Sequence, residues 1–170
     1  MLSDAINKAL NKQMKLELSS SYAYAAMAAY FHMENLDGFA NWMTLQAQEE
    51  LGHAQKLYKY IIDANGKVEF EAIDKPNSKF DSPLAVFEAS LGYEQEVTKS
   101  INELMDTAVQ EKDHATTVFL QWFVMEQVEE EADVEGIIQK LKLVGNTPNG
   151  LFMMDCALGE RRPAPAPPAS

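Results

Sequence analysis

Six side chains with metal-binding groups interrupt the apolar faces of four helical segments in this sequence. They are Glu17, Glu50, His53, Glu94, Gln127 and Glu130. Each stands at a position of the helical repeat where a hydrophobic residue is expected. Burying an unpaired carboxylate costs a large amount of free energy, so four carboxylates in one core require a cation to neutralise them. The sequence therefore predicts a buried metal centre.

The spacing of these residues indicates how they share the metal. Glu50 and His53 are three residues apart, as are Gln127 and Glu130, so each pair lies on one helix face and can reach one ion. Two helices that give one ligand and two that give such a pair form the ligand set of a di-iron carboxylate bundle. Carboxylates with one imidazole suit Fe(II), with Mn²⁺ and Zn²⁺ as competitors.

The apolar periodicity predicts five helices in an all-α fold, and the first four of them carry these residues. The five helices span about residues 3–34, 37–65, 82–108, 113–145 and 147–158. Asp37 and Asp113 are the expected N-caps of the second and fourth helices. Residues 66–82 have no helical period, and residues 68–70 are expected to be extended. A connection this long lets the second and third helices run parallel, as in four-helix bundles with one crossover.

The composition predicts one soluble domain. A chain of 170 residues suits a single core, which we expect over residues 1–160, followed by a disordered Pro/Ala-rich tail over 161–170. No apolar run reaches the roughly 18 residues of a membrane span, and residues 1–4 do not resemble a secretion signal. The single Cys156, expected to be buried and inert, suits a reducing cytoplasm. The net charge of −12 argues against binding of nucleic acid.

The ligand pattern, the long second connection and the short fifth helix together resemble a ferritin over about residues 3–159. The resemblance implies a ferritin-like four-helix bundle with a fifth helix. It implies a homo-oligomeric cage of twenty-four subunits. It also implies a ferroxidase, which oxidises Fe(II) with O2 or peroxide at a di-iron centre, and storage of the ferric mineral inside the cage.

The resemblance further implies a role for each predicted ligand. The two irons are expected to share Glu50 as a bridge, with Glu17 and His53 on one side and Glu94 and Glu130 on the other. Gln127 is expected to orient a bound water or oxygen instead of binding iron directly. The imidazole of the histidine must be neutral to bind iron.

A third iron site is implied by carboxylates beside the first two. In non-haem bacterial ferritins such a site is formed by residues that correspond to Glu49, Glu126, Glu129 and Glu130. The alternative is a solvated inner face of the helices. Haem is not expected, because Leu51 stands where bacterioferritins carry their haem-binding methionine. The resemblance is therefore to the prokaryotic-like, non-haem kind of ferritin.

Two aromatic residues are expected near the centre. Tyr24 lies two helical turns beyond Glu17 and corresponds to a tyrosine beside the di-iron centre of ferritins. It either supplies an electron or hydrogen-bonds a ligand, or it is an ordinary core tyrosine. Trp122 is expected to be a packing residue. His32 and His114 are expected to lie on the surface.

The route by which iron enters is expected to differ from that of animal ferritins. Those proteins line their three-fold channels with acidic residues, and the corresponding positions here are Thr117 and Leu120. Asp113 or Glu111 could replace that gate. We hypothesise instead that iron enters through the bundle.

Two other functions remain open at the level of sequence. A di-iron oxidase or oxygenase acting on a small organic substrate has the same ligands but needs an open apolar pocket. The alanine-rich first helix favours tight packing over such a pocket. A non-catalytic helical interaction protein would bury the glutamates by coincidence.

Overall fold

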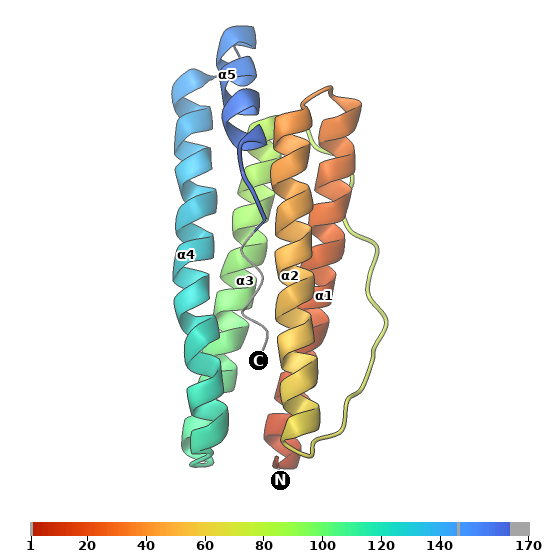
Figure 1. Ribbon diagram of the computed structural model, residues 1–170, viewed down its shortest axis with the longest axis vertical. Coiled ribbons are helices and arrows are strands. Elements are labelled where there is room, and N and C mark those ends of the chain that lie inside the picture. Colours follow the sequence, from red (N-terminus) through yellow and green to blue (C-terminus); the bar gives the residue numbers. More distant parts are fainter. Residues whose placement is uncertain (1, 146, 164–170) are drawn as a thin grey trace.

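Five α-helices make up the part of the chain that the computed structural model describes, residues 2–145 and 147–163. They are α1 (Asp4–Met33), α2 (Asp37–Asp63), α3 (Pro83–Gln110), α4 (His114–Val144) and α5 (Pro148–Gly159). The first four form an elongated bundle, and the short α5 lies at one end of it (Figure 1). The predicted all-α bundle with a short fifth helix is confirmed. Most of the expected tail, residues 164–170, lies outside the described residues.

The directions of the helices follow from the lengths of their connections. Short turns make α1 and α2 antiparallel, and α3 and α4 likewise. Residues 64–82 run along the bundle, so that α2 and α3 are parallel (Figure 1). Asn7 and Asn11 of α1 hold this connection through hydrogen bonds of 2.7–3.1 Å with its backbone. The predicted long crossover is confirmed, and no strand is present at residues 68–70.

Two apolar clusters fill the bundle, with the predicted metal ligands between them. The cluster nearer α5 is rich in aromatic residues, among them Tyr24, Phe31, Phe39, Trp42 and Phe87. The other cluster is mainly aliphatic and includes Ile6, Leu10, Leu57, Ile101 and Leu120. Along each long helix the ligand falls between residues of the two clusters. Apolar burial on both sides therefore fixes the helices and keeps the polar layer inside.

The start of α2 is capped from α5 and not by its own sequence. Leu36 takes the N-cap position without a side-chain hydrogen bond. The carboxylate of Asp155 accepts from the backbone N–H groups of Gly38 and Phe39, at 2.7 and 3.1 Å. A Cβ on Gly38 would lie 1.7 Å from the carbonyl oxygen of Asp155, so this approach requires glycine. The prediction of Asp37 as N-cap is wrong, because a distant carboxylate already satisfies these donors.

Two other positions near helix ends have different outcomes. Asp113 caps α4 as predicted, since its carboxylate accepts from the backbone N–H of Thr116 at 3.0 Å. Cys156 is exposed and not buried, because α5 turns Met154 and Leu158 toward the bundle and the cysteine lies between them in sequence.

Among the described residues, no helix is long and apolar enough to cross a membrane.

Candidate metal centre

Three predicted ligands from α1 and α2 converge on one point inside the bundle. Glu17, Glu50 and His53 each offer a ligand atom, and these atoms all lie within 4.8 Å of one another. The Nδ1 atom of His53 lies 3.5 Å from Glu50 Oε2 and 3.9 Å from Glu17 Oε2. These three atoms are buried and have no hydrogen-bond partner among the described residues. Unpaired buried polar atoms are rare, so their convergence favours a cation between them.

A second group of ligands adjoins the first through a shared carboxylate. Glu50 of α2, Glu94 of α3 and Glu130 of α4 also offer oxygen atoms within 4.8 Å of one another. All three side chains are buried. Because Glu50 belongs to both groups, two cations bound there would be neighbours with one bridging carboxylate. This arrangement brings together all the residues that were predicted as direct ligands of the two irons.

Burial and mutual repulsion keep protons on these carboxyl groups when no cation is bound. Burial raises the pKa values of Glu94 and Glu130 to about 8, and the charge of Glu50 adds to the effect. Burial and Glu50 also raise the pKa of Glu17 well above its ordinary value. Burial lowers the pKa of His53, but the nearby carboxylates, Glu50 first among them, raise the pKa by more. A bound cation must therefore displace protons.

Two glutamines hold the carboxylates of the centre in place. The Nε2 atom of Gln13 donates to Glu17 Oε1 at 2.8 Å. Gln46 donates from Nε2 to Glu50 Oε1 at 2.9 Å and to Glu130 Oε2 at 2.6 Å, so it joins α2 to α4. Neither glutamine was predicted to belong to the site. The available signal was their position, because each stands four residues before a ligand glutamate and so on the same helix face.

Tyr24 and Gln127 both contact Glu94. The buried hydroxyl of Tyr24 donates to Glu94 Oε1 and is 2.8 Å from Ser90 Oγ. Gln127 donates from Nε2 to the backbone oxygen of Glu94 at 3.2 Å and to its Oε2 at 3.3 Å. The side-chain amide of Gln127 thus donates to Glu94, a predicted metal ligand. These contacts favour a hydrogen-bonding role for Tyr24.

The residues predicted for a third site line a groove between α2 and α4 with a volume of about 580 Å³. Glu126 and Glu130 form a metal-sized group with His53, and Glu126 Oε1 lies 4.0 Å from His53 Nε2. Glu49 is part of the groove wall, where it pairs with Arg161. Glu129 is exposed in the same wall. Within the described residues, the metal-sized groups include neither Glu49 nor Glu129.

Trp122 forms part of the wall of this groove and is not a fully packed core residue. Its side chain is 38% exposed, and its ring meets the edge of the His53 ring with centroids 5.3 Å apart. The ammonium group of Lys56 lies over the Trp122 ring, 2.9 Å from its centroid. Trp122 thus packs against neighbouring rings, as predicted, but it does so at the wall of the groove. His32 and His114 are exposed, as predicted.

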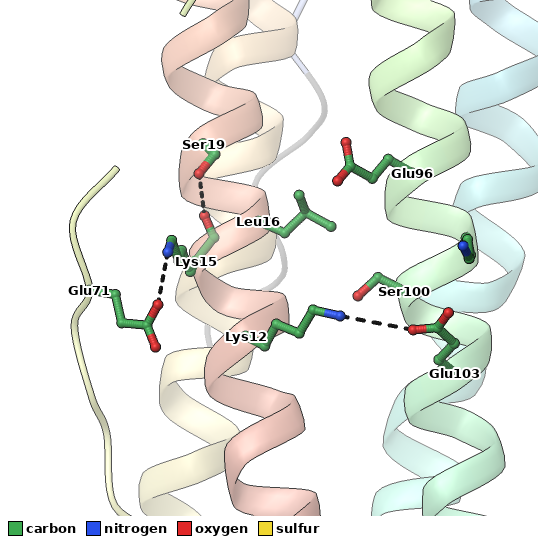
Figure 2. Close-up of a pocket in the computed structure, with 9 residues that line it drawn as sticks. Lys12, Lys15, Leu16, Ser19, Glu71, Glu96, Ser100 and Glu103 are labelled. Carbon is green, nitrogen blue, oxygen red and sulfur yellow. Dashed lines mark hydrogen bonds and ion pairs between the residues drawn. The ribbon is translucent and has the colours of Figure 1, made fainter. Parts of the chain in front are cut away.

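A second groove, of about 480 Å³, lies between α1 and α3 on another side of the bundle (Figure 2). Its two lysines on α1 form ion pairs, one with the connection that follows α2 and one across the groove with α3. Lys15 Nζ is 2.8 Å from Glu71 Oε2, and Lys12 Nζ is 3.9 Å from Glu103 Oε2. None of the predicted metal ligands lines it. The metal chemistry of the described residues is therefore concentrated in the bundle interior and the groove between α2 and α4.

Comparison with known proteins agrees with this fold and centre. A family model of the ferritin-like domain matches residues 7–144. The bacterial non-heme ferritin of Staphylococcus aureus MRSA252 is 46% identical over 161 residues, which are 95% of this chain and 97% of that protein. The bacterial non-heme ferritin of Bacteroides fragilis 638R is 43% identical, over 95% of this chain and all of that one.

Solved structures similar to this chain are also ferritins. The open-pore ferritin from the hyperthermophilic archaeon Archaeoglobus fulgidus is 46% identical and superposes with a TM-score of 0.94, covering 95% of this chain and 100% of the other. The bundle with one crossover and its buried layer of carboxyl groups define the class of ferritin-like proteins. Within that class the chain belongs to the ferritin family, whose members store iron. The resemblance inferred from the sequence is confirmed.

Proposed function

We propose that this protein oxidises Fe(II) before storing it, at the centre that α1 to α4 enclose. The observation that carries the proposal is the carboxylate of Glu50, which is shared by two adjoining groups of buried ligands. One Fe(II) would bind Glu17, Glu50 and His53, and the other would bind Glu50, Glu94 and Glu130. Two irons held side by side can each give one electron to the same oxidant.

The electron count suits O2 as well as peroxide. Two Fe(II) ions lose two electrons, which reduce O2 to peroxide, or reduce peroxide to two molecules of water once protons are added. Protons leave Glu94 and Glu130 when Fe(II) binds, because a carboxylate must be ionised to be a ligand. The Fe(III) product then moves to the mineral, so the centre must release it.

Neighbouring side chains hold the carboxylate ligands in position through hydrogen bonds. Gln127 donates to Glu94 and can hold a bound water or oxygen at the second iron, in the role predicted for it. Tyr24 fixes the same carboxylate through its hydroxyl. Gln13 and Gln46 hold Glu17 and Glu50 on the other sides. These contacts keep the ligands in position as iron binds and leaves.

A third iron is proposed to bind in the groove between α2 and α4. The grouping of His53, Glu126 and Glu130 supports it, with Glu49 and Glu129 in the same wall as further carboxylates. We infer no haem, because Leu51 has no atom that could bind haem iron. Carboxylates and one imidazole, with no thiolate among them, surround the proposed irons, which also suits Fe(II).

The assembly and location follow from family membership. We propose a homo-oligomeric cage of twenty-four subunits, since the solved relatives are ferritins. We also propose a cytoplasmic location, with the described core as one domain and the Pro/Ala-rich C-terminal residues outside it. Size-exclusion chromatography tests the assembly, because a cage elutes far earlier than a small oligomer.

Titration of Fe(II) into the metal-free protein, followed by air, tests the ferroxidase proposal. We expect fast oxidation that saturates near two Fe(II) per chain. Glu50→Ala should slow this phase by about a hundredfold, because it removes a ligand from both irons. Glu135→Ala is the matched control, since Glu135 is exposed on α4 and outside the centre. An unchanged rate in Glu50→Ala would refute the proposal.

Iron is proposed to reach the centre through the bundle, by the groove that Glu49 lines. The carboxylate of Asp113 is engaged in capping α4 and accepts from Thr116 at 2.7 Å and 3.0 Å, which leaves it poorly suited to a gate. Iron uptake by Asp113→Ala and Glu49→Ala distinguishes the routes. A strong slowing by the first and none by the second would contradict entry through the bundle.

Oxidation of an organic substrate finds less support. An apolar groove of about 230 Å³ lies between α1 and α2, and its wall includes Leu51, Tyr58 and Phe70. None of the predicted metal ligands lines that groove. A substrate bound there would be separated from the irons by the helices themselves. Iron is therefore the substrate that the centre suits best.

A further inference from the structure

Arg161, just after α5, reaches back to α2 and binds at the groove where the third iron is proposed. Its Nη2 atom lies 2.5 Å from Glu49 Oε2 and donates to Gln46 Oε1 at 2.9 Å. Its Nη1 atom donates to the backbone oxygen of Trp42 at 3.2 Å, and its guanidinium carbon lies 4.4 Å from the centroid of the Trp42 ring. Four separate contacts thus fix one side chain.

This ion pair is partly buried. The side chains of Arg161 and Glu49 are 20% and 25% exposed, far less than the other Lys or Arg pairs with carboxylates in the described part of the chain. Water and salt screen a half-enclosed pair less than an open one. The stacking on Trp42 adds a cation–π contact. The guanidinium is therefore held firmly as a positive charge inside the groove.

The position of Arg161 places it in competition with a metal cation. Glu49 is one of the four carboxylates proposed to hold the third iron, and its Oε2 already has a cationic partner. Iron can bind that oxygen only after the guanidinium group of Arg161 dissociates from it. The amide of Gln46 is also fixed by Arg161, so that its Nε2 points to Glu50 and Glu130.

We propose that Arg161 is a positioning residue that weakens the third iron site by holding Glu49. The inference rests on the proposed function, because it presupposes iron at the other two positions. Its consequence is that iron passes through the groove and is not retained there. Among the described residues no Lys or Arg forms an ion pair with Glu17, Glu50, Glu94 or Glu130, so the two inner positions bind iron without this competition.

Anaerobic calorimetric titration of the metal-free cage with Fe(II) tests this inference. In Arg161→Gln the third and weakest binding step should become about five- to tenfold tighter, as expected from removing one partly buried competing charge. Arg162→Gln is the matched control, because Arg162 is exposed and, within the described residues, donates only to the backbone oxygens of Gly159 and Arg161. It should leave every step unchanged.

Further variants separate competition from a loss of folding. Arg161→Lys keeps the positive charge and should bind the third iron as weakly as the natural protein. Arg161→Met keeps an unbranched stem over Trp42 and replaces the glutamine variant if that one does not assemble. Adding Glu49→Gln to Arg161→Gln should abolish the gain. Assembly of each variant is checked by size-exclusion chromatography.

The outcomes for the two proposals are distinct. A third step that is unchanged or weaker in Arg161→Gln, or that is undetectable in every variant, overturns the role of Arg161. Absence of the two tighter steps in the natural protein overturns the proposed function itself, whatever Arg161 does.

Discussion

At the scale of the residue, the centre is defined by atoms that lack partners. Glu17 Oε2, Glu50 Oε2 and His53 Nδ1 are buried, close together and without hydrogen bonds in the described structure. The opposite oxygens of the two carboxylates accept from glutamines. Each carboxylate thus has one oxygen fixed by an amide and one left free. This division leaves the free oxygen for a cation while the amide sets its direction.

Tyr24→Phe tests the role of the hydroxyl that donates to Glu94. That hydrogen bond lowers the pKa of Glu94, although burial raises it to about 8 overall. Without the hydroxyl the pKa of Glu94 rises further, and Fe(II) binding requires a higher pH. We expect the pH midpoint of anaerobic Fe(II) binding to move upward and the oxidation rate near pH 7 to fall several-fold.

The same variant separates positioning from electron donation. If Tyr24 supplies an electron, Tyr24→Phe should change the number of electrons released per oxidant while the pH midpoint of Fe(II) binding stays in place. Stopped-flow absorbance and anaerobic titration measure the two quantities on one preparation. Tyr30→Phe is a suitable control, because Tyr30 packs against Phe31 and Phe80 away from the ligands.

At the scale of the element, α5 contributes more to the site than its short length indicates. Asp155 caps the start of α2, and Arg161 binds the same helix one to three turns further on. Both contacts tie α5 to the helix that carries Glu50 and His53. The position of α5 therefore influences where these two ligands lie.

Asp155→Ala tests this link. It leaves the backbone N–H groups of Gly38 and Phe39 without their acceptor, so we expect a loss of about 1–2 kcal/mol in the free energy of unfolding. Thermal unfolding of the metal-free protein measures it. Glu160→Ala removes a similar charge from an exposed position near α5 and should change little. Equal stability of both variants would show that the cap is dispensable.

The helices and the convergence of the candidate ligands could be predicted from the sequence because both follow from local periodicity. A glutamate on an apolar stripe is visible without knowledge of any partner. The roles of Asp155 and Arg161 could not be predicted, since their partners lie more than a hundred residues away in the sequence. The role of Gln46 was not predicted for another reason. A neutral amide on the apolar face of a helix costs less free energy to bury than a carboxylate, so it is a weaker signal of a functional site.

At the scale of the whole molecule, two apolar clusters stabilise a fold that also buries a layer of carboxyl groups. Burial of that layer is unfavourable by itself. The aromatic cluster near α5 and the aliphatic cluster at the other end hold the helices together. Between them, Glu17, Glu94 and Glu130 retain protons more readily than exposed carboxyl groups do. In the metal-free protein this layer therefore lowers the free energy of unfolding as the pH rises, and a cation bound at the proposed centre would offset that loss.

The pH dependence of unfolding tests this balance. In the unfolded chain Glu94 and Glu130 titrate near 4.5, whereas in the folded chain their pKa values are about 8. Between these values the folded state binds more protons, so their contribution to stability is complete below about pH 4.5 and is lost as the pH rises through 8. We expect the melting temperature of the metal-free protein to fall from pH 5.5 to pH 8.5.

The high negative charge of the chain also destabilises it as the pH rises, so variants must separate the two effects. Glu94→Gln and Glu130→Gln each remove one buried titration and should flatten the decline, whereas Glu135→Gln, at an exposed position, should leave its slope unchanged. Anaerobic Fe(II) should raise the melting temperature more at pH 8.5 than at pH 5.5, because binding needs ionised carboxylates. Parallel slopes for all three variants would mean that surface charge and not the buried layer governs the pH dependence.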